Sequence, residues 1–156
     1  MNKNTMSEIS RCNKFAVTAH SVLAVIISIA YFLEVVKGSR ELWYVLIVVG
    51  LNIIPMISEI IIYKRNRDSE ALRYVIAATY LAMYGFVMVT TNNVLVFTYI
   101  VPMLFAFLGY NKAKFVFGVN AVAFVINVIQ VIVATKTKAI PNYTTAVIEI
   151  QLLVLL

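Results

Sequence analysis

Long apolar segments joined by short charged connectors are the feature that most constrains the fold of this 156-residue chain. A helix that crosses the hydrocarbon core of a bilayer needs about 20 mostly apolar residues. Five segments approach or exceed that length, and a shorter sixth lies at the C-terminal end. These predicted spans are Phe15–Val36, Leu42–Tyr63, Tyr74–Thr91, Val94–Tyr110, Phe115–Ala134 and Thr144–Leu156. Because the connectors contain only a few residues, we expect consecutive spans to run antiparallel.

The composition excludes a soluble domain. Hydrophobic residues make up 62% of the chain and charged residues 13%, against about 45–50% and about 25% in soluble domains. Strands of membrane β-barrels are about 10 residues long and alternate between apolar and polar positions, and the spans show no such alternation. We therefore predict an all-α, polytopic transmembrane helical bundle with five full spans and a truncated sixth. Residues 1–14 are predicted to form a cytoplasmic segment, and residues 15–156 the transmembrane region.

The sixth span, Thr144–Leu156, is shorter than a full crossing and has no aromatic or basic flank after it. Such flanks usually mark the point where a membrane helix leaves the bilayer. We therefore expect the sequence to be a fragment, with an output module after Leu156.

Lysine and arginine predict the orientation, because cytoplasmic connectors carry an excess of both. One side of the predicted bundle holds nine: Lys3, Arg11, Lys14, Lys64, Arg65, Arg67, Arg73, Lys112 and Lys114. The other holds four: Lys37, Arg40, Lys136 and Lys138. We expect the N-terminus to be cytoplasmic. The net charge of +6 then reflects topology and anionic lipid headgroups, and no nucleic-acid partner is predicted.

No enzyme signature is present. The sequence contains no glycine-rich phosphate loop, no paired metal-ligand spacing and no nucleophile with a base at a recognisable interval. We expect no catalytic residue, cofactor or metal. His20, the only histidine, is expected to make an interhelical contact, with a proton relay as the alternative. Cys12, the only cysteine, is expected to be a juxtamembrane thiol, with palmitoylation as the alternative.

Polar side chains inside the spans carry the strongest functional signal, because each costs a few kcal/mol in hydrocarbon unless it finds a partner or water. Asn127, Gln130 and Glu149 fall in the predicted outer half of the bilayer, and Tyr99 lies at a similar depth. These residues either line a cavity where a signal molecule binds, or hold helices together at about 0.6 kcal/mol each. Gln151 is placed on roughly the opposite helix face from Glu149.

Glu59 is predicted to lie at the cytoplasmic edge of the bilayer, one turn from Lys64 and Arg65. We expect its carboxylate to snorkel toward the interface or to pair with one of those cations. The following connector also contains Arg67 and Arg73 and is expected to anchor the topology. Contact with a cytoplasmic module is the alternative role for this connector.

Several segments together resemble a known type of membrane region. They are Arg11-Cys12-Asn13-Lys14, Glu34-Val35-Val36-Lys37-Gly38, Tyr99-Ile100-Val101-Pro102-Met103, Leu108-Gly109-Tyr110-Asn111-Lys112 and Glu149-Ile150-Gln151-Leu152-Leu153. The arrangement resembles the six-helix N-terminal membrane region of a group of bacterial methyl-accepting chemotaxis proteins. In that group the last membrane helix continues into a cytoplasmic signalling coiled coil. Related sensor regions precede diguanylate cyclase and histidine kinase modules.

The resemblance implies the membrane sensor portion of a bacterial signal-transducing receptor in the inner (cytoplasmic) membrane. Its expected partners are the lipid bilayer, a second copy in a homodimer or higher assembly, and cytoplasmic signalling proteins reached through the missing C-terminal part. One alternative is a fragment of a small transporter or permease that uses Glu59 and Glu149. Another is a structural membrane protein without a ligand.

Overall fold

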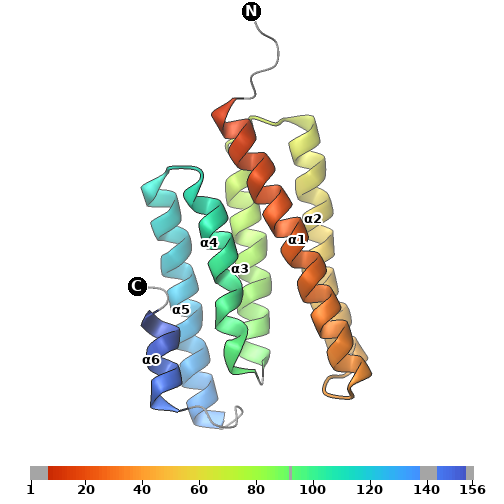
Figure 1. Cartoon of the computed structure of the whole chain (residues 1–156), viewed down its shortest axis with the longest axis vertical. Helices are drawn as coiled ribbons and strands as arrows, with labels where there is room; N and C mark the ends of the chain where they lie inside the picture. Colours follow the sequence, from red (N-terminus) through yellow and green to blue (C-terminus); the bar gives the residue numbers. More distant parts are fainter. Residues whose placement is uncertain (1–6, 92, 138–143, 154–156) are drawn as a thin grey trace, which may run out of the picture.

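The computed structural model describes residues 7–91, 93–137 and 144–153, and these residues form antiparallel helices joined by short turns (Figure 1). The elements are α1 (Glu8–Val36), α2 (Leu42–Arg65), α3 (Leu72–Thr90), the 3₁₀ helix η1 (Val94–Tyr99), α4 (Ile100–Leu108), α5 (Ala113–Thr137) and α6 (Thr145–Leu153). The predicted all-α class is confirmed for these residues. Helix α1 begins seven residues before the predicted first span, so it takes in part of the expected N-terminal segment 1–14.

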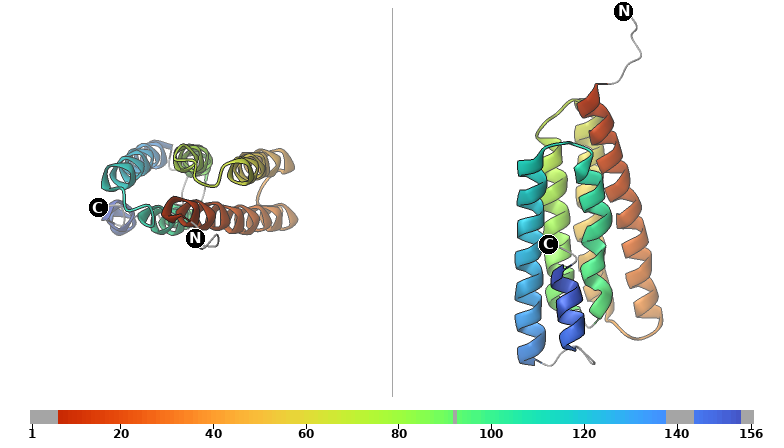
Figure 2. Two further views of the ribbon diagram at one scale, coloured as in Figure 1. Left: turned by 90° about the horizontal axis from the view of Figure 1, so that it is seen from above. Right: turned by 60° about the vertical axis from the view of Figure 1, so that its left-hand side comes forward.

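The helices form two layers. Seen along the bundle, α5, α3 and α2 lie in one row, and α6, α4 and α1 lie in the other (Figure 2). Within the rows, α3 packs against both α2 and α5, and α1 packs against α4. Contacts of α1 with α2 and α3, of α4 with α5, and of α5 with α6 join the layers. Helix α3 is the most buried of the four long helices, and it provides Tyr80, Met83 and Tyr84 to the core.

Local sequence sets both ends of α1. The Ser7 hydroxyl accepts a hydrogen bond from the Ser10 amide at 3.0 Å, which satisfies one of the free N–H groups at a helix start. At the other end Gly38 has a φ of 71°, a left-handed conformation that costs glycine little. The amides of Gly38 and Ser39 then donate to the carbonyls of Val35 and Glu34, each at 2.9 Å. This C-terminal cap turns the chain toward α2.

The predicted count of five full spans is not confirmed. Within the described residues, four helices are long and apolar enough to cross a bilayer: α1, α2, α3 and α5. The predicted fourth span consists of η1 followed by the nine-residue α4. A 3₁₀ helix rises about 2.0 Å per residue and an α-helix about 1.5 Å, so the two together reach roughly 25 Å. The last residues of the predicted sixth span, 154–156, lie outside the described residues.

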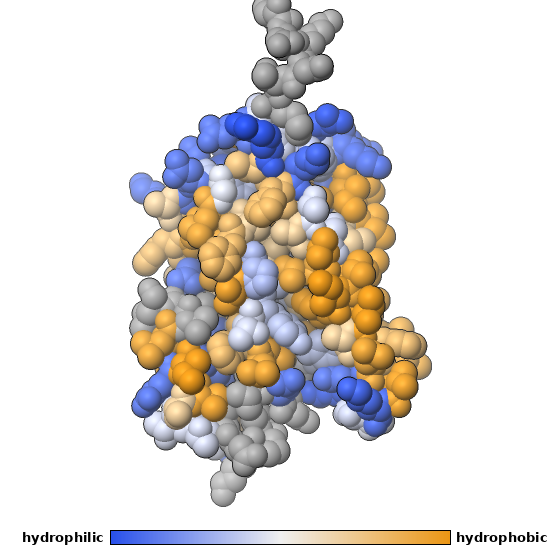
Figure 3. All heavy atoms as spheres, in the orientation of Figure 1, coloured by the Kyte–Doolittle hydropathy of each residue, from blue (hydrophilic) through white to orange (hydrophobic). Residues whose placement is uncertain are grey.

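The face of the bundle seen in Figure 3 is mostly apolar between two polar ends. Exposed side chains in this belt include Phe15, Val22, Ile26, Ile29, Phe32, Leu46, Ile54, Ile57, Phe105, Phe117, Val125, Ile129 and Ile132. A soluble protein rarely exposes a contiguous apolar surface of this size, whereas lipid-facing helices require one. The long apolar helices and this belt are compatible with a membrane protein.

The two polar ends differ in charge. The start of α1, the α2–α3 connector and the α4–α5 connector lie at the same end of the bundle (Figure 1). This end, here called the basic end, carries Arg11, Lys14, Lys64, Arg65, Arg67, Arg73, Lys112 and Lys114. Among the described residues, the opposite end carries Lys37, Arg40 and Lys136.

Candidate functional site

A buried histidine–glutamate pair joins three helices inside the bundle. The Nδ1 atom of His20 in α1 lies 2.7 Å from Oε2 of Glu59 in α2, and both side chains are 0% exposed. The hydroxyl of Thr79 in α3 donates to Oε1 of Glu59 at 2.7 Å. Each oxygen of the carboxyl group therefore has a partner on a different helix.

The environment of His20 is aromatic on one side. Its ring meets the ring of Tyr80 edge to face, with 5.3 Å between the centroids. The second ring nitrogen, Nε2, is buried and has no hydrogen-bond partner among the described residues. Removing two charges from water is costly, and only close geometry with further hydrogen bonds offsets that cost. The 2.7 Å contact and the Thr79 hydroxyl supply both.

The predicted role of Glu59 at the cytoplasmic edge, by snorkelling toward the interface or by pairing with Lys64 or Arg65, is wrong. The side chain of Glu59 faces the interior of the bundle, whereas Lys64 and Arg65 lie exposed in the last turn of α2. Cations near the C-terminus of a helix interact favourably with its dipole, so both have a favourable place without Glu59. The interhelical contact expected of His20 is confirmed. Sequence alone did not reveal its partner, because pairing depends on how α1 and α2 are rotated against each other.

A cluster of amide side chains joins α5 and α6. Nε2 of Gln151 donates to Oδ1 of Asn127 and to Oε1 of Gln130, both at 2.9 Å. Nδ2 of Asn127 in turn donates to the Tyr84 hydroxyl in α3 at 2.7 Å. Asn127, Gln130 and Gln151 are between 0% and 4% exposed. These four residues, here called the amide cluster, connect three helices through side chains alone.

The structure brings together only two of the four predicted signal-site residues, Asn127 and Gln130. Glu149 is exposed, and Gln151 takes the position beside the two amides. The prediction that Glu149 and Gln151 occupy opposite faces of the helix is correct, but the face turned toward the bundle is the one with Gln151. Tyr84 was missed by sequence reasoning because a tyrosine in an apolar span gives no sign of whether its hydroxyl has a partner.

Tyr99 lies away from the amide cluster. It lines an apolar hollow of about 180 Å³ between α1 and the η1–α4 segment, together with Ile27 and Pro102. Its carbonyl oxygen accepts a hydrogen bond from the Tyr80 hydroxyl at 2.5 Å. The predicted single cavity containing Tyr99, Asn127, Gln130 and Glu149 is therefore not formed.

The predicted basic anchor divides into two kinds of residue. Lys64, Arg65 and Arg67 are exposed, as expected for side chains that meet headgroups or water. Arg73 is only 6% exposed. Its NH2 atom lies 2.9 Å from a carboxylate oxygen of Glu70. Arg73 is thus held inside the basic end.

Comparison with known proteins adds no family assignment. No family model matches this chain, and neither a curated protein nor a solved structure matches it.

Proposed function

We propose that this chain is the membrane sensor portion of a bacterial signal-transducing receptor of the methyl-accepting chemotaxis type. In this proposal α6 carries the signal toward a cytoplasmic output domain. A signal in or outside the membrane changes the relative population of two packings of α6 against α5. The receptor acts as a homodimer or higher assembly in the inner membrane, with the basic end in the cytoplasm.

The attachment of α6 to the bundle is the observation that carries the proposal. Gln151 is the one buried residue of α6 within its described residues, Thr145–Leu153. Its two hydrogen bonds to Asn127 and Gln130 hold the helix in place, and such bonds contribute about 0.6 kcal/mol each on average in membrane helices. Because Gln151 is the side chain through which the described part of α6 enters the bundle, a change at this contact alters how α6 packs against α5. A ligand that prefers one packing then shifts the population toward that packing by as much as its preference allows.

The proposal is tested with a hybrid receptor in which residues 1–156 are fused to a chemoreceptor signalling domain. Gln151→Leu removes both hydrogen bonds and is expected to shift the basal kinase output. Glu149→Gln changes an exposed neighbour on the same helix and serves as the matched control. Equal output from both variants and the parent, at equal membrane abundance, contradicts the role of α6.

Two further measurements address the rest of the proposal. The reading frame after Leu156 distinguishes a chemoreceptor coiled coil from a diguanylate cyclase or histidine kinase module. Reporter fusions at the α2–α3 and α1–α2 connectors test the orientation, with a cytoplasmic signal expected only from the first. Crosslinking in membranes tests for the dimer.

The pair of His20 and Glu59 favours a second candidate, a proton-linked transporter or permease fragment. Ionisable side chains inside membrane segments often belong to ion or proton pathways. This candidate predicts proton flux in vesicles that contain the protein, and loss of that flux in Glu59→Gln. A receptor predicts no flux in either case.

A further inference from the structure

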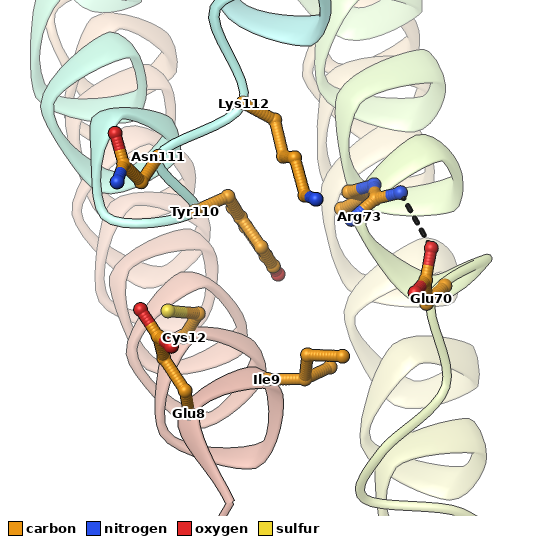
Figure 4. Close-up of a pocket in the computed structure, with 8 residues that line it drawn as sticks. All are labelled: Glu8, Ile9, Cys12, Glu70, Arg73, Tyr110, Asn111 and Lys112. Carbon is orange, nitrogen blue, oxygen red and sulfur yellow. Dashed lines mark hydrogen bonds and ion pairs between the residues drawn. The ribbon is translucent and has the colours of Figure 1, made fainter.

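A polar pocket of about 280 Å³ opens at the basic end of the bundle. It lies between the start of α1, the start of α3 and the turn that joins α4 to α5 (Figure 4). Its lining includes Glu8, Glu70, Arg73, Tyr110 and Lys112. Neither the buried histidine–glutamate pair nor the amide cluster belongs to it.

Arg73 is fixed in the wall of this pocket. Its guanidinium carbon lies 4.9 Å from the centre of the Tyr74 ring and 6.0 Å from that of Phe115. The contact with Glu70 occupies NH2. The Nε atom is buried and has no hydrogen-bond partner among the described residues. Arg73 therefore holds its charge at the pocket wall, with Glu70 the one ion-pair partner it has among the described residues.

Lys112 brings a second cation to the same place. Its side chain extends from the α4–α5 turn toward the guanidinium of Arg73 (Figure 4). Lys112 is exposed and forms no ion pair within the described part of the chain. Two cations that approach each other repel unless an anion lies between them.

The turn that carries Lys112 is held in position by two hydrogen bonds to α1. The Tyr110 hydroxyl donates to Oδ1 of Asn13 at 2.8 Å, and the Cys12 thiol donates to the Gly109 carbonyl at 3.0 Å. Asn111 has a φ of 49°, a conformation that asparagine tolerates better than most residues. Because the turn is tied to α1, the backbone of Lys112 has a defined position at the mouth of the pocket.

We propose that this pocket binds a phosphate group between Arg73 and Lys112. The planar guanidinium suits phosphate oxygens, and the lysine ammonium adds a point charge. Glu8, at the edge of the pocket, faces the part of the ligand beyond the phosphate and accepts hydrogen bonds from a hydroxyl or ammonium group. The phosphate belongs either to a lipid headgroup with such a group, since basic ends of membrane bundles lie at headgroup level, or to a free phosphate ester. This inference does not depend on the proposed receptor function.

The test uses the full chain, purified in a neutral detergent and titrated by calorimetry. One probe is short-chain phosphatidylglycerol, and the other is glycerophosphoglycerol, which has the same phosphodiester and glycerol groups without acyl chains. Lys112→Gln is the informative variant, because Lys112 is exposed and its replacement leaves the core intact. Lys114→Gln is the matched control, since Lys114 is exposed two residues away and is not part of the pocket lining.

We expect Lys112→Gln to weaken binding about tenfold to a hundredfold, as loss of a charge-assisted hydrogen bond does, and Lys114→Gln to leave it unchanged. Binding of phosphatidylglycerol alone identifies a lipid as the source of the phosphate. Binding of both probes identifies the phosphate group itself as sufficient. Absence of binding by both probes overturns the proposal, and so does an equal loss in the two variants, because a diffuse basic surface then accounts for the affinity.

Discussion

Removal of the Glu59 side chain is predicted to destabilise the protein through His20 rather than through Thr79. In Glu59→Ala the His20 ring loses its partner at 2.7 Å while remaining fully buried. Thr79 retains alternatives, because its hydroxyl lies 2.9 Å from the Val75 carbonyl and 3.1 Å from the Ile76 carbonyl. Breaking a buried ion pair costs about 3–5 kcal/mol. Since only one of the two partners of Glu59 is left without an acceptor, we expect about 3 kcal/mol.

A double-mutant cycle isolates this interaction. The cycle compares His20→Leu and Glu59→Leu with the variant that carries both, in which apolar groups replace both polar ones, a change that is often neutral for a buried pair. We expect the double variant to recover about 2 kcal/mol of the sum of the two single losses. The measurement is reversible unfolding in mixed detergent micelles, followed by far-ultraviolet circular dichroism.

Glu34 provides the matched control. It lies in α1, its carboxylate is 3.6 Å from Arg40, and 36% of its side chain is exposed. Exposed ion pairs contribute about 0–1 kcal/mol, so Glu34→Ala is expected to have little effect. Simple addition of the two single losses would show that His20 and Glu59 are not coupled. A loss in Glu34→Ala equal to that in Glu59→Ala would show that burial of the pair does not matter.

Three further predictions concern stability in the same unfolding assay. Gly38 has a φ of 71°, so Gly38→Ala should lower the free energy of unfolding by about 1 kcal/mol. Gly50 lies inside α2, where an added methyl group meets no atom within 4 Å, so Gly50→Ala should leave the free energy of unfolding unchanged or raise it. Asn13→Ala removes the donor to the carbonyls of Arg67 and Ser69, at 2.8 and 3.0 Å. The free energy of unfolding should fall by about 2 kcal/mol, and limited proteolysis should cut the α2–α3 connector faster. Tyr84→Phe leaves the Asn127 amide without this acceptor, for an expected loss of about 1 kcal/mol; unchanged stability there contradicts the contact.

The sequence was sufficient for the all-α class and the alternating direction of the long helices, because apolar length and short connectors determine both. Four predicted spans correspond to long helices, and the polar faces at residues 127 and 130 are buried as the helical period requires. The prediction of a full α-helical fourth span was wrong, because hydropathy does not distinguish a 3₁₀ helix, which Val94–Tyr99 forms, from an α-helix.

The partners of the polar residues were not predictable in the same way. Glu59 and Lys64 are close in sequence, and proximity along the chain suggested a local pair. The actual partner, His20, is 39 positions away. Likewise, helical period separated Glu149 from Gln151 but did not determine which of the two faces α5. Both questions depend on the rotation of one helix against another, which is set by the packing of many apolar side chains at once.

Helix α3 takes part in both buried polar clusters, through Thr79 in one and Tyr84 in the other. A rotation of α3 about its axis therefore moves the hydrogen-bond partners of Glu59 and of Asn127 in a single step. Coupling of this kind is reciprocal: a substitution at Glu59 that turns α3 also alters the hold on α6, and release of α6 in turn alters the packing around Glu59.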